Sequence, residues 1–84
     1  MVKKIVTLDI KDGLHARPAS EIIQFLRSFT STVKMKYGKK EANCKSMISL
    51  LALGIKTKAE VELQLEGTDA EQELQSFANF LENL

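Results

Sequence analysis

Hydrophobic and polar residues alternate without interruption over residues 59–66. Val61, Leu63 and Leu65 fall on one side of this segment, and glutamates and a glutamine fall on the other. Because successive side chains of a strand point to opposite faces, the pattern predicts a strand with one buried face. A looser alternation predicts a first strand over residues 2–11. Residues 32–37 and about 40–44, on either side of Gly38, predict a hairpin.

Apolar residues recur at helical spacing in two longer segments, residues 16–28 and 68–84. The first stripe consists of Ala19, Ile22, Ile23 and Leu26, and the second of Leu74, Phe77, Ala78 and Leu81. Each stripe predicts an amphipathic helix with one buried face. Thr68 and Glu71 have the spacing of a capping box, which predicts that the second helix starts there.

A shorter helix is predicted between Ser46 and Gly54. A serine hydroxyl is a good N-cap, and glycine accommodates the left-handed conformation that commonly ends a helix. The segment between them is apolar almost all round, so one or two of its large side chains must face solvent. These side chains are Met47, Ile48, Leu50, Leu51 and Leu53. An exposed apolar cluster is typical of a partner-binding surface.

The predicted elements follow the order β-α-β-β-α-β-α. Strands with one polar face favour an antiparallel sheet with helices packed on the other face, which defines an α+β protein. With 84 residues the chain can bury one modest core, so we expect a single domain over residues 1–84.

Charge is unevenly distributed, although the net charge is only +1. Residues 1–58 hold all 12 lysines and arginines and four acids, whereas residues 59–84 hold seven acids and no base. A basic face that steers an anionic partner is one interpretation. We favour the simpler one, that the two halves pair in the folded protein. The small net charge argues against nucleic-acid binding.

Cys44 is the only cysteine, so no internal disulfide can form, as is usual in a reducing compartment. One cysteine and one histidine cannot complete a structural zinc site, and we expect no metal or other cofactor. The longest uncharged run, residues 46–55, is far shorter than the ~20 residues of a membrane span. The N-terminal residues do not have the pattern of a signal peptide. We therefore expect a cytoplasmic protein.

The segment GLHARPAS, residues 13–20, contains the only histidine and the only proline. Pro18 predicts that a helix starts nearby, which places His15 at its N-terminus. Unpaired N–H groups and the positive end of the helix dipole favour anions there, and the planar guanidinium of Arg17 suits phosphate. A neutral imidazole can attack phosphorus. His15 is therefore a candidate phosphoryl acceptor, and Arg17 a candidate stabiliser of the arriving charge.

The simpler interpretation is that His15 only caps the helix, although histidine is a mediocre cap. The residues alone leave the two interpretations about equal. A hydrolytic site is disfavoured even though Ser20 and Asp12 lie close in sequence, because so small a domain has little room for a substrate cavity.

Ser46 also has two interpretations. The structural one, an N-cap with no further role, is the more common case. In the functional one Ser46 is phosphorylated, which places about two negative charges at a helix N-terminus. The fold tolerates them there, but they would repel an acidic partner.

At these two segments the chain resembles the HPr family, the histidine-containing phosphocarriers of the bacterial sugar phosphotransferase system. GLHARPAS resembles the family's active-site motif. NCKSMISLLALG, residues 43–54, resembles its regulatory-serine motif, although Met47, Ile48 and Ser49 replace a frequent Ile-Met-Gly. The chain length and the predicted element order also match, so the resemblance covers the whole chain.

The resemblance implies an open-faced β-sandwich, in which three helices cover one face of a four-stranded antiparallel sheet. It implies that His15 accepts a phosphoryl group on Nδ1 from phosphorylated Enzyme I and passes it to sugar-specific IIA proteins. Arg17 would stabilise the phosphohistidine. Such a protein is a stoichiometric carrier and not an enzyme, and we expect a monomer.

The resemblance also implies a regulatory role for Ser46. An ATP-dependent HPr kinase/phosphorylase would phosphorylate it, which would hinder the Enzyme I reaction and create a corepressor for a catabolite control protein. By the same likeness, the docking surface around His15 would consist of Ala16, Ser20, Met47, Ile48 and Leu51.

Three other functions are compatible with the sequence. The same histidine could serve a nitrogen-type phosphotransfer chain, which would differ in the protein that phosphorylates it. A binding module that docks through the apolar helix would keep its function after His15→Ala. A small enzyme is the least favoured, for want of a pocket. Because the histidine is present, the chain does not resemble the catabolite-regulation paralogue that lacks it.

Overall fold

Four strands form one antiparallel sheet in the order β1-β4-β2-β3. The computed structural model describes residues 1–84, and its strands are β1 (Val2–Leu8), β2 (Thr32–Tyr37), β3 (Lys40–Asn43) and β4 (Ala59–Glu66). β4 pairs with β1 on one side and β2 on the other, with Val61 opposite Val6 and Leu63 opposite Met35. The most regular alternation in the sequence therefore belongs to a central strand.

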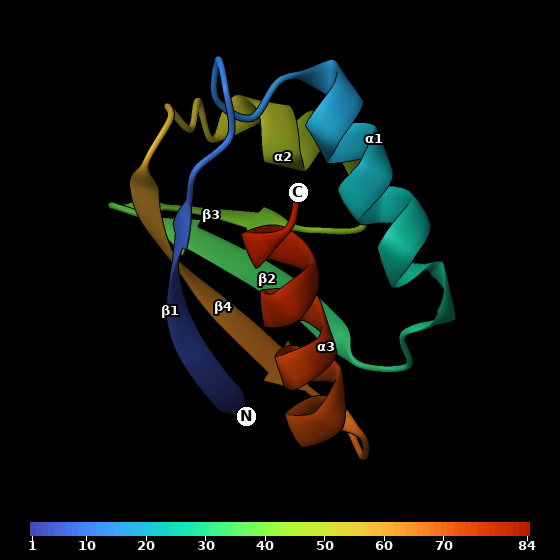
Figure 1. Ribbon diagram of the computed structural model, residues 1–84. Coiled ribbons are helices and arrows are strands. Elements are labelled where there is room, and N and C mark those ends of the chain that lie inside the picture. The colour runs from blue at the N-terminus through green and yellow to red at the C-terminus, as the bar shows by residue number, and fades with distance from the viewer.

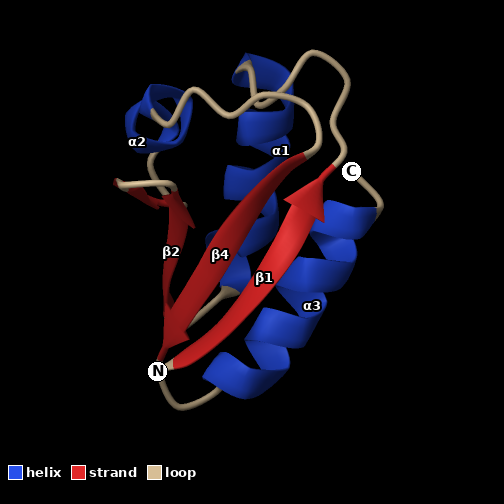
Figure 2. Cartoon of the chain, turned by 90° about the vertical axis from the view of Figure 1, so that its left-hand side faces the viewer, coloured by secondary structure: helices blue, strands red, loops and turns tan.

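Three helices lie on one side of the sheet and leave the opposite face open (Figures 1 and 2). They are α1 (Ala16–Phe25), α2 (Met47–Ala52) and α3 (Ala70–Glu82). α3 packs against β1 and β4, whereas α2 lies next to α1 and β3 at one end of the sheet. This arrangement confirms the α+β class and the open-faced β-sandwich.

The core lies between the sheet and the helices. The inward side chains of β4 and the apolar stripes of α1 and α3 meet there and form one cluster with the loop residues Ile10, Leu14 and Ile55. Burial of each large apolar side chain stabilises the fold by about 1.5–3 kcal/mol. Cys44 is fully buried in the same cluster. Burial raises the pKa of its thiol to about 12, so the thiol stays protonated and unreactive at neutral pH.

The structure corrects the end of the first predicted strand and the type of the last turn in the first predicted helix. The first strand ends at Leu8 instead of residue 11, because Gly13 N donates to Ile10 O (2.9 Å) and the chain turns towards α1. The helix predicted over 16–28 has this length, but its last turn, Leu26–Ser28, is a 3-10 helix. Such tightening is frequent at helix C-termini.

The predicted capping box of α3 is wrong. The N-cap residue is Asp69, one position after Thr68, and its side chain makes no capping hydrogen bond. The preceding Gly67 has φ +158° and lies against Ser31, so the turn before α3 is set by this contact between distant segments. Gly54 and Gly38, in contrast, occupy the predicted helix end and hairpin turn with positive φ.

Glu73, in the first turns of α3, holds the loop between α1 and β2. Its carboxylate accepts hydrogen bonds from the backbone N–H groups of Thr30 and Ser31, both at 3.0 Å. Desolvation by burial acts to raise the pKa of Glu73, but the hydrogen bonds from Ser31 and Thr30 outweigh it and lower the pKa. The ionised carboxylate therefore stabilises the folded state.

Glu73→Gln should lower the free energy of unfolding at pH 7 by roughly 0.5–1 kcal/mol, since the charge-assisted bonds are lost and the site is partly solvent-screened. A lowered folded-state pKa gives stability that is present above the ordinary value of 4.5 and lost as the pH falls through the folded-state pKa. The difference from wild type should therefore shrink below pH 4.5. Urea unfolding at several pH values measures it, with Glu71→Gln as the control. A difference that stays constant down to pH 3 would contradict the prediction.

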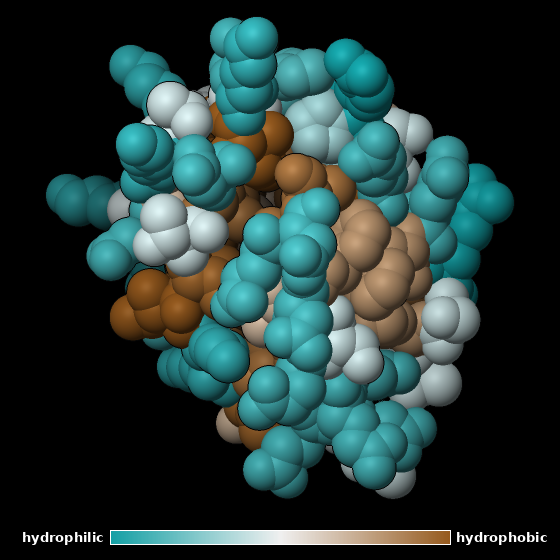
Figure 3. Space-filling view, in the orientation of Figure 1, coloured by the Kyte–Doolittle hydropathy of each residue, from teal (hydrophilic) through white to brown (hydrophobic).

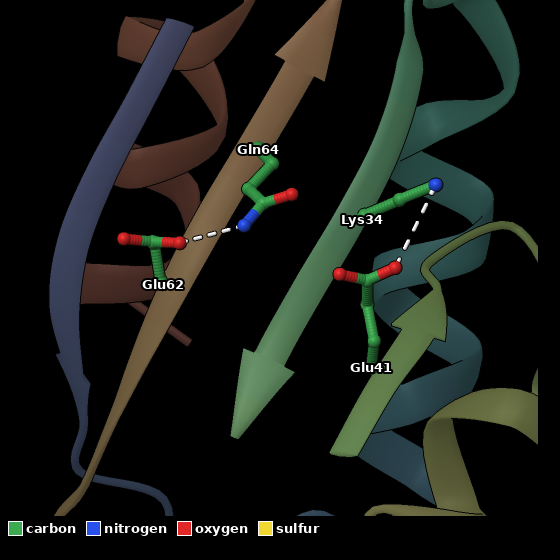
Figure 4. A network of polar contacts seen from close by, with 4 residues as sticks. All are labelled: Lys34, Glu41, Glu62 and Gln64. Atoms are coloured by element: carbon green, nitrogen blue, oxygen red, sulfur yellow. Dashed lines mark hydrogen bonds and ion pairs between the residues drawn. The ribbon is translucent and has the colours of Figure 1, made fainter. Parts of the chain in front are cut away.

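The basic half of the chain, residues 1–58, and the acidic half, residues 59–84, are not joined by ion pairs in the fold. The ion pair that forms, Lys34 with Glu41 at 3.6 Å, joins two residues of the basic half (Figure 4). Lys36 lies opposite Glu62 in the register, but the Glu62 carboxylate instead accepts a hydrogen bond from Gln64 at 2.6 Å. The favoured interpretation of the charge asymmetry is therefore wrong, because no ion pair joins the two halves. In two cases the acid is engaged elsewhere: backbone N–H groups occupy the carboxylate of Glu73, and an amide occupies that of Glu62.

Candidate functional site

The loop that leads to the histidine is held by a close approach of two backbones. Gly13 has φ +74°, and a side-chain carbon at this position would overlap Ile55 O. The neighbouring Leu14 donates its N–H to the same oxygen at 3.0 Å, and its side chain is buried. The segment that follows α2 therefore fixes the position of the residue after Leu14, which is His15.

His15 is the N-cap residue of α1, as the sequence predicts. Its backbone is extended, with φ −102° and ψ −171°, and its carbonyl oxygen accepts the first helical hydrogen bond from Ala19 N. The imidazole makes no capping hydrogen bond and is exposed. Both ring nitrogens are therefore free to react. A histidine that only capped the helix would not need a free imidazole, so this feature favours the functional interpretation.

The first turn of α1 presents unpaired donors beside the imidazole. The amide groups of Ala16 and Arg17 have no acceptor within the helix, and Pro18 carries no N–H. Pro18 is buried, which anchors the turn, while Arg17 is exposed. No acidic residue lies in this first turn. A helix N-terminus with these properties is suited to an anion.

His15 and Arg17 line one hollow of about 280 Å³. The other lining residues are Ile10, Lys11, Pro18, Glu21 and Leu84. The structure thus brings together the two residues that the sequence predicts for phosphate chemistry. Lys11 and Glu21 were not predicted. Glu21 follows Arg17 by four residues, a spacing that places both on one helix face and could have indicated it.

Ser46 lies outside this hollow, at the N-terminus of α2. Its Oγ accepts a hydrogen bond from Ser49 N at 3.3 Å, so the predicted N-cap is confirmed. The neighbouring Lys45 donates through Nζ to Phe29 O and Ser31 O, each at 3.0 Å. Ser46 is half-buried.

Large apolar side chains of α2 face solvent, as the sequence predicts. Ile48 is 82% exposed and Leu51 39% exposed, whereas Leu50 and Leu53 are buried. Met47 is half-buried. On the adjacent α1, Ala16 is exposed and Ser20 half-buried. The five predicted docking residues therefore all reach the surface on two helices that pack side by side.

Gly13→Ala should lower the free energy of unfolding by about 2–4 kcal/mol, because it adds both left-handed strain and the overlap with Ile55 O. Gly38→Ala is a matched control: Gly38 also has positive φ, but nothing lies within 4 Å of the added carbon. The control should lose only about 1 kcal/mol. Urea unfolding of both variants tests this, and equal losses would show that the contact with Ile55 is unimportant.

Comparisons with known proteins agree with this fold. The family model described as the PTS HPr component phosphorylation site matches residues 2–83. The phosphocarrier protein HPr of Mycoplasma capricolum is 37% identical over 76 residues, which cover 90% of this chain and 85% of that protein. The HPr-like protein Crh of Bacillus subtilis is 35% identical over 82 residues, 98% of this chain and 96% of that protein.

A solved structure gives the same result. HPr-C-His from Thermoanaerobacter tengcongensis superposes with a TM-score of 0.90 at 30% identity and covers 98% of this chain and 92% of that chain. The fold and the sequence motifs are those of a phosphocarrier of the bacterial phosphotransferase system. The chain belongs to the HPr family.

No helix in the structure is both long and apolar enough to cross a membrane.

Proposed function

We propose that this chain carries phosphoryl groups on His15, accepting them from phosphorylated Enzyme I and passing them to IIA proteins of sugar permeases. The observation that carries the proposal is the exposed, unbonded imidazole at the N-cap of α1, in one hollow with Arg17. An imidazole that only capped the helix would be tied to a backbone N–H.

The geometry supports a simple transfer. The lone pair of a neutral ring nitrogen attacks phosphorus, and the bond between phosphorus and the donor breaks as the new N–P bond forms. Two negative charges then lie beside the free N–H groups of Ala16 and Arg17 and the Arg17 guanidinium. We assign the attack to Nδ1, in line with the family. The phosphoryl group is later passed on by the reverse process. A nucleophile of the IIA protein attacks phosphorus, and the N–P bond to His15 breaks as the new bond forms.

The hollow around His15 is shallow and has no enclosed substrate cavity. The chain therefore presents one group to larger partners, as a stoichiometric carrier does. Ala16, Ser20, Met47, Ile48 and Leu51 form the surface that we propose these partners contact. The large exposed fraction of Ile48 supports this role, because an exposed apolar side chain gains most when a partner covers it.

Intact mass spectrometry tests the carrier role. The chain is incubated with phosphoenolpyruvate and a catalytic amount of Enzyme I, and one added phosphate that is lost in acid is expected. Addition of a IIA protein should return the carrier to its unmodified mass. A folded protein that gains no mass would contradict the proposal.

We further propose that the chain acts as a single-domain monomer in the cytoplasm, which sedimentation and fractionation would test.

We also propose that Ser46 is a regulatory phosphorylation site, modified by an HPr kinase/phosphorylase and read by a catabolite control protein. Ser46 heads α2, next to the proposed docking residues Met47 and Ile48. A phosphate there would add about two negative charges to the surface that partners cover. The position of Ser46 at the head of α2, where it is only half-buried, and its resemblance to the family motif support this assignment.

Ser46→Asp should slow phosphoryl uptake from Enzyme I by roughly tenfold, since a single buried like charge at an interface costs a few kcal/mol at most and Asp carries half the charge of a phosphate. Ser46→Ala should keep the wild-type rate and lose only about 1 kcal/mol of stability with the cap. Ser28→Asp, on an exposed residue of the 3-10 helix, is the charge control. Equal rates for both aspartate variants would overturn the regulatory assignment.

A further inference from the structure

A second surface of the molecule, between α1 and α3, has no role in the proposed transfer. Phe25 of α1 and Phe80 of α3 stack there, with ring centroids 4.1 Å apart and an interplanar angle of 9°. Phe29 packs against Phe25 at 5.4 Å. All three rings are only half-buried. Figure 3 shows an apolar area beside the polar outer face of α3, on the side of α1.

The stacked rings form the floor of a groove of about 420 Å³. The groove is also lined by Ser76 and Asn79 of α3, by Asn83 and Leu84 just after this helix, and by Glu21 of α1. The amide and hydroxyl groups can hydrogen-bond a peptide backbone, and Glu21 is the one charged side chain among the lining residues. The groove therefore offers an aromatic floor, neutral polar groups and a single negative charge.

This groove adjoins the hollow around His15. Glu21 and Leu84 line both. Glu21 lies one helical turn from Arg17 on one side and one turn from Phe25 on the other, so the two hollows follow the same face of α1. A protein that covers His15 and Arg17 is thereby placed over the entrance of the aromatic groove.

We propose that the groove between α1 and α3 is a docking site for the protein that exchanges a phosphoryl group with His15. The partner inserts one apolar side chain over the Phe25–Phe80 stack and places a basic side chain against Glu21. The inference rests on the proposed phosphocarrier function. It extends the contact surface from the α2 side of α1 to its α3 side (Figure 2).

The shape of the groove selects this occupant over others. It is open along its length, whereas a small-molecule site buries most of its ligand. A second copy of the chain would need about 800 Å² of surface on each partner, far more than seven lining residues supply. The surface of the groove is large enough only to enlarge an interface that a partner already forms elsewhere. The adjoining His15 hollow provides that interface.

Asn79→Arg tests the proposal without disturbing the core, because Asn79 is exposed and its side chain forms no hydrogen bond in the fold. The long cationic side chain would cover the rings and repel the partner's basic group. Gln75→Arg adds the same charge to the same helix at an exposed position outside the groove. Initial rates are measured against carrier concentration for uptake from phosphorylated Enzyme I and for transfer to a IIA protein.

We expect Asn79→Arg to raise KM about tenfold in at least one of the two steps with kcat within twofold, and Gln75→Arg to match wild type. Phe80→Leu, which keeps an apolar side chain but removes the stacked ring, should shift KM in the same direction. Asn79→Arg and Phe80→Leu variants that behave like Gln75→Arg in both steps would overturn the docking site. Sedimentation velocity tests the alternative occupant. If the wild-type chain forms dimers that Asn79→Arg dissociates, the groove binds a second copy of the chain, and the proposed partner docking site is wrong. A wild-type chain that takes up no phosphate contradicts the carrier function instead.

Discussion

His15→Ala should abolish the uptake of phosphate from phosphorylated Enzyme I while the protein stays folded. The imidazole is the only one in the chain, and no other side chain in the hollow can form an N–P bond of the same reactivity. The side chain is exposed and makes no capping hydrogen bond, so its removal should change the free energy of unfolding by no more than about 0.5 kcal/mol. Intact mass and a urea unfolding curve on the same sample measure both effects.

The acid stability of the product distinguishes this result from phosphorylation elsewhere. A phosphate on histidine is lost in acid, whereas a phosphate on Ser46 survives it. A His15→Ala variant that still gains an acid-labile phosphate would show that a different group is the acceptor. A variant that gains none but keeps full activity in sugar uptake would favour the binding-module interpretation.

Arg17→Ala should slow phosphoryl uptake by about a hundredfold, the cost of removing one preorganised charge donor from a transition state that gains charge. Arg17 lines the hollow with His15, and its guanidinium can form two parallel hydrogen bonds to a phosphate. Arg17→Lys keeps the positive charge but loses this fork, so it should recover only part of the rate, to within about tenfold of wild type. Stopped reactions at limiting Enzyme I, analysed by intact mass, give the three rates.

A surface lysine provides the matched control for the loss of charge. Lys39 lies in the turn between β2 and β3, away from the hollow, and Lys39→Ala removes one positive charge from the same molecule. This variant should retain the wild-type rate. If Lys39→Ala and Arg17→Ala were equally slow, long-range attraction of an acidic partner would explain the loss, and the local role of Arg17 would be wrong.

Much of the fold follows from local patterns. The alternation over residues 59–66, the helical stripe from Ala19 to Leu26, the Ser46 cap and the glycine turns all lie where the sequence predicts them, because each depends on side chains a few positions apart. Two of the errors arise where distant segments meet. The contact of Gly67 with Ser31 sets the start of α3, and the amide of Gln64 takes the carboxylate that Lys36 faces.

The candidate site divides in the same way. Histidine at a helix start, arginine two residues later and the first-turn proline lie close together in the chain, so the sequence by itself determined which side chains the candidate site contains. The tertiary structure decided how that site is held and what surrounds it. Gly13 meets the backbone of Ile55, 42 positions away, and Glu21 joins the His15 hollow to an aromatic groove whose rings come from α1 and α3. These contacts depend on the packing of whole elements, and no spacing within a single segment encodes them.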